Sequence, residues 1–367
     1  MKLVSICFFC AWKIIKKSCW GCGTNDVIRW GFQNGKQRFK CNNCRLLFTR
    51  QNKAVKQKNR FVWFAKWVLH RHTFTYLSSQ SGYSIRTLKT LFHSYLAQAP
   101  VLKVFPREQL HLLIDGTYFS NDICLIIYRD NEIKFTQLYR LSNGEHFEEI
   151  KEDLENLLSM GIQIKSITCD GHKAILKAIR HSCKATIVQR CLVHIQRECR
   201  LWLSLKPKSN EGLQLLIIVN QLHLIENERS YQLWLKQLYD WHEEHKSYIK
   251  EKSISAATNR YWYKHKMVRR AFIHLKNALP NMFHYLNDSK IPKSTNGLES
   301  FFGHLKSHLL LHRGLTKEHR KNFIKWYLYF RNNSWVFKAI NNKEWKQKSR
   351  WQIRCQRLIL RGKSYCY

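Results

Sequence analysis

The stretch from residue 110 to residue 189 alternates short apolar runs with amphipathic segments, and this alternation constrains the fold more than any other feature. The apolar runs have the length and β-branched content of strands, whereas the segments between them have helical periodicity. Strands are expected at 110–115, 123–129, 133–141, 164–169 and 185–189, and helices at 145–160 and 173–181. The pattern predicts a mixed α/β domain.

Acidic residues stand at the ends of two of these expected strands. Asp115 ends the run His-Leu-Leu-Ile-Asp, and Asp170 ends Ile-Lys-Ser-Ile-Thr-Cys-Asp. Three consecutive strands, a helix, a strand, a helix and a strand is the order of a ribonuclease-H-like core. Sheets of this kind place their sites at strand ends, so both acids are candidate site residues.

Two Cys-x2-Cys pairs, Cys19/Cys22 and Cys41/Cys44, are separated by 18 residues. Four thiolates at this spacing can close on one tetrahedral zinc ion. Between the pairs run two strand-like segments joined by Asn34-Gly35, which favours a hairpin turn. Residues 15–50 are therefore expected to form a zinc ribbon with one structural Zn²⁺. A third pair, Cys7 and Cys10, has no second pair left to join and is interpreted as buried or incidental.

A polar, basic stretch at 53–60 is interpreted as a linker, and a helix-turn-helix domain is expected at 58–98. The core spacing of Leu77, Gly82, Ile85, Leu88 and Leu91 predicts a short helix, a turn at Gly82, an N-cap at Ser84 and a second helix from about Ile85. The second helix would turn three side chains toward DNA: Arg86, Lys89 and His93. Small three-helix units also occur as plain packing modules, and that alternative stays open.

Helical periodicity dominates residues 200–290, with helices expected at 213–224, 231–245 and 261–279. An all-helical insertion is therefore expected to divide the α/β core into 105–199 and 291–335. The second part of the core carries Glu299 within Ser-Thr-Asn-Gly-Leu-Glu-Ser, in a helical setting. A basic turn at His312-Arg313 precedes an aromatic helix at 321–330, and a basic C-terminal tail occupies 336–367.

The charge of the chain points to a polyanionic partner. Sixty-three Lys and Arg against 25 Asp and Glu leave a formal charge of +38, spread from end to end and interleaved with aromatic residues. Such an excess repels itself in a compact fold unless a polyanion takes up part of it, so DNA or RNA is the expected partner. No clean basic amphipathic face or long apolar run favours a membrane. The odd number of cysteines, several of them single in apolar runs, is typical of reduced cysteines, and we expect a cytoplasmic, nucleoid-associated protein.

Three acids in a strongly basic chain suit metal-dependent phosphodiester chemistry. A two-metal site needs carboxylates that hold two Mg²⁺ or Mn²⁺ ions about 4 Å apart, one beside the attacking oxygen and one beside the leaving oxygen. Asp115, Asp170 and a later helical Glu299 can converge in this way. A lone acid at a strand end is more often a turn or cap residue, but all three in this order favour the metal site.

The chain resembles the DDE transposases of bacterial insertion sequences, in their Mutator-like branch. The resemblance rests on Ile114-Asp-Gly-Thr117, Thr168-Cys-Asp-Gly-His172, Cys191-Leu-Val-His194 and Ser294-Thr-Asn-Gly-Leu-Glu-Ser300, and it spans about 105–335. A zinc ribbon and a helix-turn-helix in front of the core occur in some members. The segment around Glu299 and the Cys-x2-His are its most specific pieces.

This resemblance implies an enzyme that nicks the ends of its element and then joins a 3′ hydroxyl to target DNA, with Asp115, Asp170 and Glu299 as the metal-binding triad. It also implies binding of terminal repeats by the insertion and the N-terminal domain, and a homo-oligomer on DNA. Cys191 and His194 match a family feature that is structural or positions DNA. Two ligands would leave a metal under-coordinated, so packing or hydrogen bonding is the favoured interpretation.

Other interpretations remain beside this one. The core could serve a nuclease, or the chain could be a DNA-binding regulator derived from a transposase. An acidic cluster is interpreted as a solvated helix face; its members are Glu145, Glu148, Glu149, Glu152, Asp153 and Glu155. His172 is expected either to touch the scissile phosphate or to cap a helix. His312 and Arg313 either contact phosphate or form a basic surface, and Arg313 is retained as a DNA-binding candidate.

Overall fold

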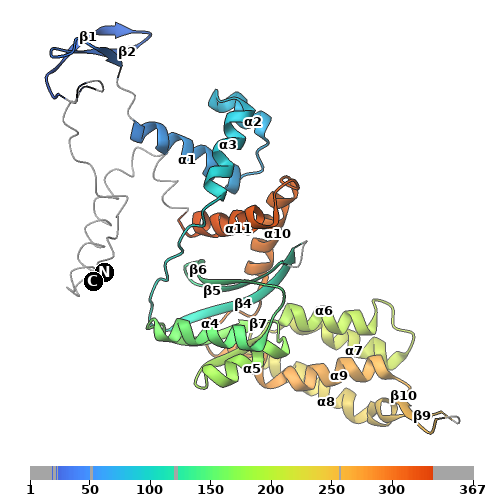
Figure 1. Cartoon of the computed structure of the whole chain (residues 1–367). Helices are drawn as coiled ribbons and strands as arrows, with labels where there is room; N and C mark the ends of the chain where they lie inside the picture. Colours follow the sequence, from blue (N-terminus) through green and yellow to red (C-terminus); the bar gives the residue numbers. More distant parts are fainter. Residues whose placement is uncertain are drawn as a thin grey trace. The chain divides into compact units, whose positions relative to one another are not determined.

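The computed structural model describes residues 19, 22, 24–49, 53–119, 123–255 and 258–333. The chain divides into two compact units, Met1–Phe64 and Ala65–Tyr367, which are treated separately (Figure 1). Cys7, Cys10 and the expected tail at 336–367 lie outside the described residues.

The first unit contains a small antiparallel sheet in the order β1-β2-β3. Its strands are β1 (Val27–Gln33), β2 (Lys36–Cys41) and β3 (Leu47–Thr49). Asn34 and Gly35 join β1 to β2 with φ of 48° and 70°. Positive φ at both positions matches the twist of a two-residue hairpin, and Asn-Gly adopts it at little cost. The predicted hairpin is confirmed, and β3 adds a third strand.

The expected linker at 53–60 is wrong, because helix α1 (Lys53–Leu69) runs through it. Its Lys, Ala and Gln residues have good helix propensity, so a polar composition alone does not indicate a linker.

Helices α2 (Phe74–Ser81) and α3 (Ile85–Leu96) are joined by the turn that the sequence predicts. Gly82 ends α2 in the left-handed conformation at φ 71°, and the Ser84 hydroxyl accepts the first cap hydrogen bond of α3 from the Thr87 N–H. Leu77 and Leu88 are buried as expected, whereas Ile85 is exposed and Phe92 takes the next core position.

The second unit is built on a five-stranded mixed sheet in the order β6-β5-β4-β7-β8. Its strands are β4 (Leu110–Phe119), β5 (Ile123–Asp130), β6 (Phe135–Ser142), β7 (Ile164–Cys169) and β8 (Ile187–Arg190). The first three pair antiparallel, and β7 and β8 join in parallel beside β4. All five expected strands are present. Asp115, however, does not end its strand, because β4 continues to Phe119 in register with β5.

Helices cover both faces of this sheet (Figure 1). Helices α4 (Phe147–Ser159) and α5 (Lys173–Ser182) share one apolar cluster with the sheet, built around Ile114, Ile126 and Leu154. Helices α10 (Asn296–Leu310) and α11 (Lys317–Asn332) cover the other face. Asn332 fixes α11 to β6, because its amide accepts from the Thr136 N–H and donates to the Thr136 C=O, each at 2.8 Å.

The end of α1 and helix α3 pack on α10 and α11. The Trp67 ring lies 4.5 Å from that of His312 and 5.2 Å from that of Phe323, centre to centre. The Asn322 amide donates to the Leu96 carbonyl at 2.8 Å. The expectation that His312 touches phosphate is therefore wrong: its ring is buried against aromatic neighbours, which only the tertiary packing reveals.

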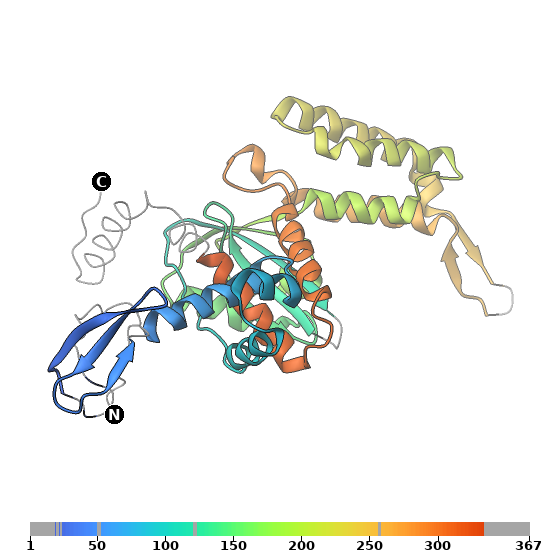
Figure 2. The same ribbon diagram turned by 90° about the horizontal axis from the view of Figure 1, so that it is seen from above.

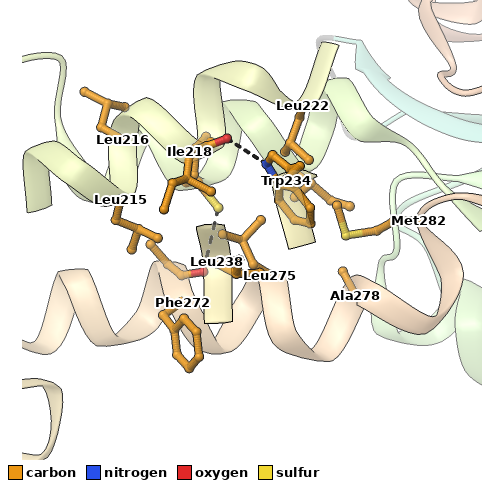
Figure 3. Packing of buried hydrophobic residues seen from close by; sticks show 14 of the residues in the cluster. Leu215, Leu216, Ile218, Leu222, Trp234, Leu238, Phe272, Leu275, Ala278 and Met282 are labelled. Atoms are coloured by element: carbon orange, nitrogen blue, oxygen red, sulfur yellow. Dashed lines mark hydrogen bonds between the residues drawn. The ribbon is translucent and has the colours of Figure 1, made fainter. Parts of the chain in front are cut away.

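The insertion has its own core, shown in Figure 3, in which Leu215, Trp234 and Leu275 are buried and the Trp234 indole N–H donates to the Ile218 carbonyl at 2.9 Å. Its helices are α6 (Leu192–Leu203), α7 (Asn210–Asn220), α8 (Glu228–Lys250) and α9 (Lys266–Ala278), with short 3₁₀ turns at Gln221–Leu224, Leu279–Asn281 and His284–Leu286.

The expectation of an all-helical insertion is wrong. Strands β9 (Lys252–Ile254) and β10 (Tyr261–Tyr263) pair as an antiparallel hairpin at the end of the insertion remote from the sheet (Figure 2). The run Tyr-Trp-Tyr favours strand over helix, and the expected helix begins only at Lys266.

Candidate active site

The parallel pairing of β4 with β7 brings Asp115 and Asp170 side by side. Ile114 pairs with Cys169, so the next residue of each strand is an aspartate. Ile114 packs with α4 and α5, and alternation along β4 therefore turns Asp115 toward the face that α10 covers. Asp115 is only 6% exposed, whereas Asp170, just beyond β7, is half-buried.

Each aspartate accepts a hydrogen bond from a nearby backbone N–H. Asp115 Oδ1 accepts from the Gly116 N–H at 2.9 Å, and Asp170 Oδ1 accepts from the His172 N–H at 2.8 Å. In the part of the chain that the structure describes, neither carboxylate pairs with Lys, Arg or His, although the chain carries 63 Lys and Arg. Two neighbouring carboxylates that make no direct ion pair suit a metal cation better than a structural salt bridge.

Burial raises the pKa of Asp115 to about 7. His194 lowers this pKa by its positive charge, while the Asp170 and Glu145 carboxylates raise it by repulsion. A carboxyl pKa raised by burial and by neighbouring carboxylates is typical of a functional site.

Gly171 opens the loop after Asp170 with φ of 93°. A Cβ at this position would lie 1.9 Å from Arg190 Nε, so the Arg190 side chain occupies space that only a glycine leaves open. Arg190 donates from Nη2 to the backbone oxygen of Asp170 at 3.2 Å. The guanidinium therefore fixes the loop through its backbone, and no described residue forms an ion pair with the Asp170 carboxylate.

Glu145 lies close enough to the two aspartates for their charges to repel, which the sequence did not indicate. Its side chain is 9% exposed, and Oε1 lies 2.0 Å from where a Cβ on Gly116 would stand. Burial raises the pKa of Glu145, and Asp170 raises it further by repulsion. The solvated-face interpretation is wrong for Glu145, which precedes α4, and for Asp153, which is buried against Arg140 and Tyr128.

His172 stands at the N-cap position of α5, but its side chain makes no cap hydrogen bond. Its Nδ1 lies 3.2 Å from Glu145 Oε2, and the ring is about half exposed. The prediction that the imidazole caps the helix is therefore wrong, and the ring lies against the Glu145 carboxylate instead.

Glu299 lies in the first turn of α10 and points to α6. Arg197 donates to both of its oxygens, at 3.0 and 3.1 Å, and His194 Nε2 lies 3.3 Å from Oε1. Among the described residues, Cys19, Cys22, Cys41 and Cys44 form the one group of three or more ligand side chains close enough to share a metal. His194 thus contacts Glu299 and also interacts electrostatically with both aspartates. The Glu299 carboxylate itself does not lie within metal-sharing distance of the two aspartates.

Cys191 and His194 come together through Thr295, which lies four residues before Glu299. The Thr295 N–H and hydroxyl donate to Cys191 Sγ at 3.3 and 3.5 Å, and the hydroxyl lies 3.4 Å from His194 Nδ1. Burial lowers the pKa of His194, but Cys191 and the two aspartates outweigh it and raise the value to about 9. Cys191 and His194 therefore take part in hydrogen bonds with Thr295. These contacts tie α6 to the start of α10.

The four cysteines of the first unit form a compact ligand set. Their Sγ atoms all lie within 4.8 Å of one another, with Cys19 and Cys44 at 3.4 Å and Cys22 and Cys41 at 3.5 Å. A tetrahedral zinc with bonds of about 2.3 Å needs sulfur atoms about 3.8 Å apart. The Cys44 N–H also donates to Cys41 Sγ at 3.4 Å, as in a thiolate turn. The set fits one structural Zn²⁺.

The DNA-binding candidates are all exposed. Arg86, Lys89 and His93 lie on α3 at spacings of three and four, which places them on one helix face. His93 also contacts the His319 ring of α11 at 5.1 Å. Arg313 lies in the turn between α10 and α11.

Residues 139–308 match the family model described as Transposase, Mutator family. The matched segment runs from β6 to α10 and contains Asp170, Cys191, His194 and Glu299, while Asp115 lies before it. The expected resemblance is confirmed for these residues, which match a Mutator-family transposase domain. A comparison with curated proteins returned no match. None of the described helices is long and apolar enough to cross a membrane.

Proposed function

We propose that the protein is a DDE transposase that binds the ends of its insertion sequence and carries out metal-dependent strand cleavage and strand transfer. The carrying observation is the pair Asp115 and Asp170, set side by side by parallel strands, without a basic partner among the described residues, at a Mutator-family transposase domain. Three antiparallel strands followed by two parallel strands, with helices between, support a ribonuclease-H-like core at 105–199 and 291–335.

The residues present fit a divalent metal. Asp115 and Asp170 offer hard oxygen ligands, each fixed by a backbone N–H, and Asp115 is too buried for solvent alone to compensate its negative charge. Together with Glu299 they would hold two Mg²⁺ or Mn²⁺ ions, which supply activation of the attacking oxygen and stabilisation of the leaving oxygen. The protein positions the two aspartates side by side, and among the described residues no Lys, Arg or His forms an ion pair with either of them.

Glu299 needs a change of partner to reach the aspartates. Arg197 is 59% exposed, so a DNA phosphate can compete for its guanidinium. Once Arg197 binds a DNA phosphate instead of Glu299, the Glu299 side chain can turn toward Asp115. Thr295 meanwhile holds the start of α10 on Cys191 and His194. The Cys191–His194 pair is therefore a positioning element for Glu299.

DNA recognition is assigned to the parts outside the core. The zinc ribbon at 15–50 and the helix-turn-helix at 58–98 would bind terminal repeats, with Arg86, Lys89 and His93 facing the DNA and Arg313 on a nearby turn. The insertion at 200–290 and the basic segment at 336–367 add to the +38 charge that favours a polyanion. A homo-oligomer on DNA would hold both ends of the element and the target.

The test is nicking of a DNA that carries the sequences flanking this gene, in Mg²⁺ or Mn²⁺. The parent, Asp170→Asn and the control Asp240→Asn, an exposed acid on α8, are compared for binding and cleavage. Cleavage by the parent and the control but not by Asp170→Asn, with equal binding by all three, supports the proposal. Tight binding with cleavage by none favours a regulator, and cleavage without strand transfer favours a nuclease.

A further inference from the structure

The hairpin of β9 and β10 carries three large apolar side chains in water, at the end of the insertion remote from the sheet (Figure 2). Ile254 is 65% exposed, Tyr261 58% and Trp262 51%, although the insertion has an apolar core of its own in which other side chains are fully buried. Large apolar side chains that stay in water add little to the fold, and a group of them indicates an interaction surface.

The two faces of this hairpin have different surroundings. Tyr261 pairs with Ile254 and Trp262 with Ser253, so alternation along the strand places Trp262 on the face opposite Tyr261. On the Tyr261 face, Lys252 Nζ lies 4.0 Å from the centre of the Tyr261 ring. On the other face the neighbour of Trp262 across the hairpin is the small Ser253, and within the described part of the chain no cation, ring or hydrogen-bond partner engages the indole. This face therefore presents an open aromatic ring.

Basic side chains lie on both sides of Trp262 along the same strand. The Ser255 N–H donates to the Arg260 carbonyl at 2.9 Å, and at the other end the Lys264 N–H donates to the Glu251 carbonyl at 3.0 Å. The pairing therefore extends one residue beyond each end of β10. Alternation then places Arg260 and Lys264 on the Trp262 face, each about 7 Å along the strand from it.

The charge of this region selects the kind of partner. Residues 250–270 contain seven Lys and Arg against one acid, Glu251. Two copies of the chain brought together here would place like charges side by side, whereas a nucleic acid takes them up through its phosphates. A base inside a duplex is stacked on its neighbours, so an unpaired base is the one that offers a free face to the Trp262 ring.

We propose that the hairpin of β9 and β10 binds single-stranded DNA, with an unpaired base stacked on Trp262 and the adjoining phosphates bound by Arg260 and Lys264. Aromatic rings beside basic groups hold single strands without reading their sequence. Lys264 also bonds Glu251 at 2.5 Å, but both side chains are about half exposed, so a phosphate can compete for the ammonium group. The inference rests on the proposed function and deepens it, because cleavage at an element end leaves a strand free to unpair.

The experiment measures the affinity of the full-length, zinc-loaded protein for a mixed-sequence single strand and for the same sequence as a duplex, by fluorescence anisotropy. Other basic parts of the chain bind both DNAs, so the ratio of the two affinities isolates the contribution of the unpaired bases. Trp262→Ala should weaken single-strand binding about tenfold or more and leave duplex binding within about twofold of the parent. Trp262→Phe keeps a ring and should retain most of the affinity. The control Tyr239→Ala removes an exposed ring from α8 and should resemble the parent.

A cross-link locates the strand on the hairpin directly. A single strand with 5-iodouracil in place of thymine is irradiated on the protein, which is then digested with trypsin. Cleavage after Arg260 and after Lys264 releases the peptide 261–264. We expect a cross-link on Trp262 in this peptide from the single strand and none from the duplex. Arg260→Gln should also lower the slope of log K against log salt concentration for the single strand by about 0.7, because one phosphate contact is lost.

Unchanged single-strand affinity in Trp262→Ala, or no cross-link in the peptide 261–264, overturns the inference. Failure of the proposed function is read separately, from DNA cleavage by the parent and by Asp170→Asn. If only the parent cleaves DNA while Trp262→Ala binds the single strand as the parent does, the inference alone is wrong. If Asp170→Asn still cleaves DNA, the proposed function itself is wrong.

Discussion

Replacing Asp115 by Asn should make the metal-free protein more stable at neutral and alkaline pH. The pKa of Asp115 rises from 3.8 to about 7, first because the group is buried and also because Asp170 and Glu145 repel its charge. A raised carboxyl pKa means that the folded state favours the uncharged form. This stability is fully present below pH 4 and is lost as the pH rises through 7.

The size of the effect follows from the same values. A pKa rise from 3.8 to about 7, at about 1.4 kcal/mol per unit, corresponds to at most about 4 kcal/mol. Asparagine has no charge to lose and can still accept from the Gly116 N–H through its oxygen. The parent should therefore lose up to this amount of unfolding free energy relative to Asp115→Asn between pH 4 and pH 8.

The assay is urea denaturation of both proteins across this pH range, zinc-loaded and without other divalent cations, with Asp240→Asn as an exposed control. Subtracting the curves removes the groups that titrate equally in parent and variant. Parallel curves for the parent and Asp115→Asn would refute the claim that burial and neighbouring carboxylates destabilise the charged Asp115. Adding Mg²⁺ should reverse the order, because only the parent keeps the full ligand set.

The remaining predictions concern other parts of the molecule. Cys22→Ser should lower the bound zinc from one ion to about none, measured by metal content, and should weaken end binding. Thr295→Val removes a hydroxyl that bonds Cys191 and should slow DNA cleavage about tenfold or more without changing DNA affinity, whereas Thr295→Ser should retain activity. Trp67→Ala should cost about 3–5 kcal/mol of unfolding free energy in thermal or urea denaturation, because the ring is fully buried. Arg86→Ala should weaken DNA binding and reduce the slope of log K against log salt concentration by about one. An unchanged slope would mean that Arg86 of α3 does not contact phosphate.

Local features of the sequence were enough to predict much of the fold. The strand Ile164–Cys169 is a bounded β-branched run, and its limits are as expected. Asn34-Gly35 and Gly82 need backbone conformations that few other residues adopt, so both turns were predictable. Asp115 and Asp170 were predictable as candidate site residues because each follows a short apolar run and precedes a glycine.

The parts that the sequence did not reveal depend on contacts between distant residues. Glu145 stands among many acids before a helix, and its burial depends on Gly116, 29 residues earlier. The Arg197 fork on Glu299 joins residues that are 102 positions apart. His312 is polar in sequence but packs on Trp67, and no local pattern signals a partner so remote.

The central claim is tested most directly by strand transfer. A short DNA ending in the element's terminal sequence with a free 3′ hydroxyl is mixed with plasmid, Mg²⁺ and either the parent or Asp170→Asn, and joined products are measured on a gel and by sequencing. The account predicts joining by the parent, none by Asp170→Asn, and none from an end with a 3′-deoxy nucleotide. Joining by Asp170→Asn, or none by a parent that binds the same end tightly, would contradict it.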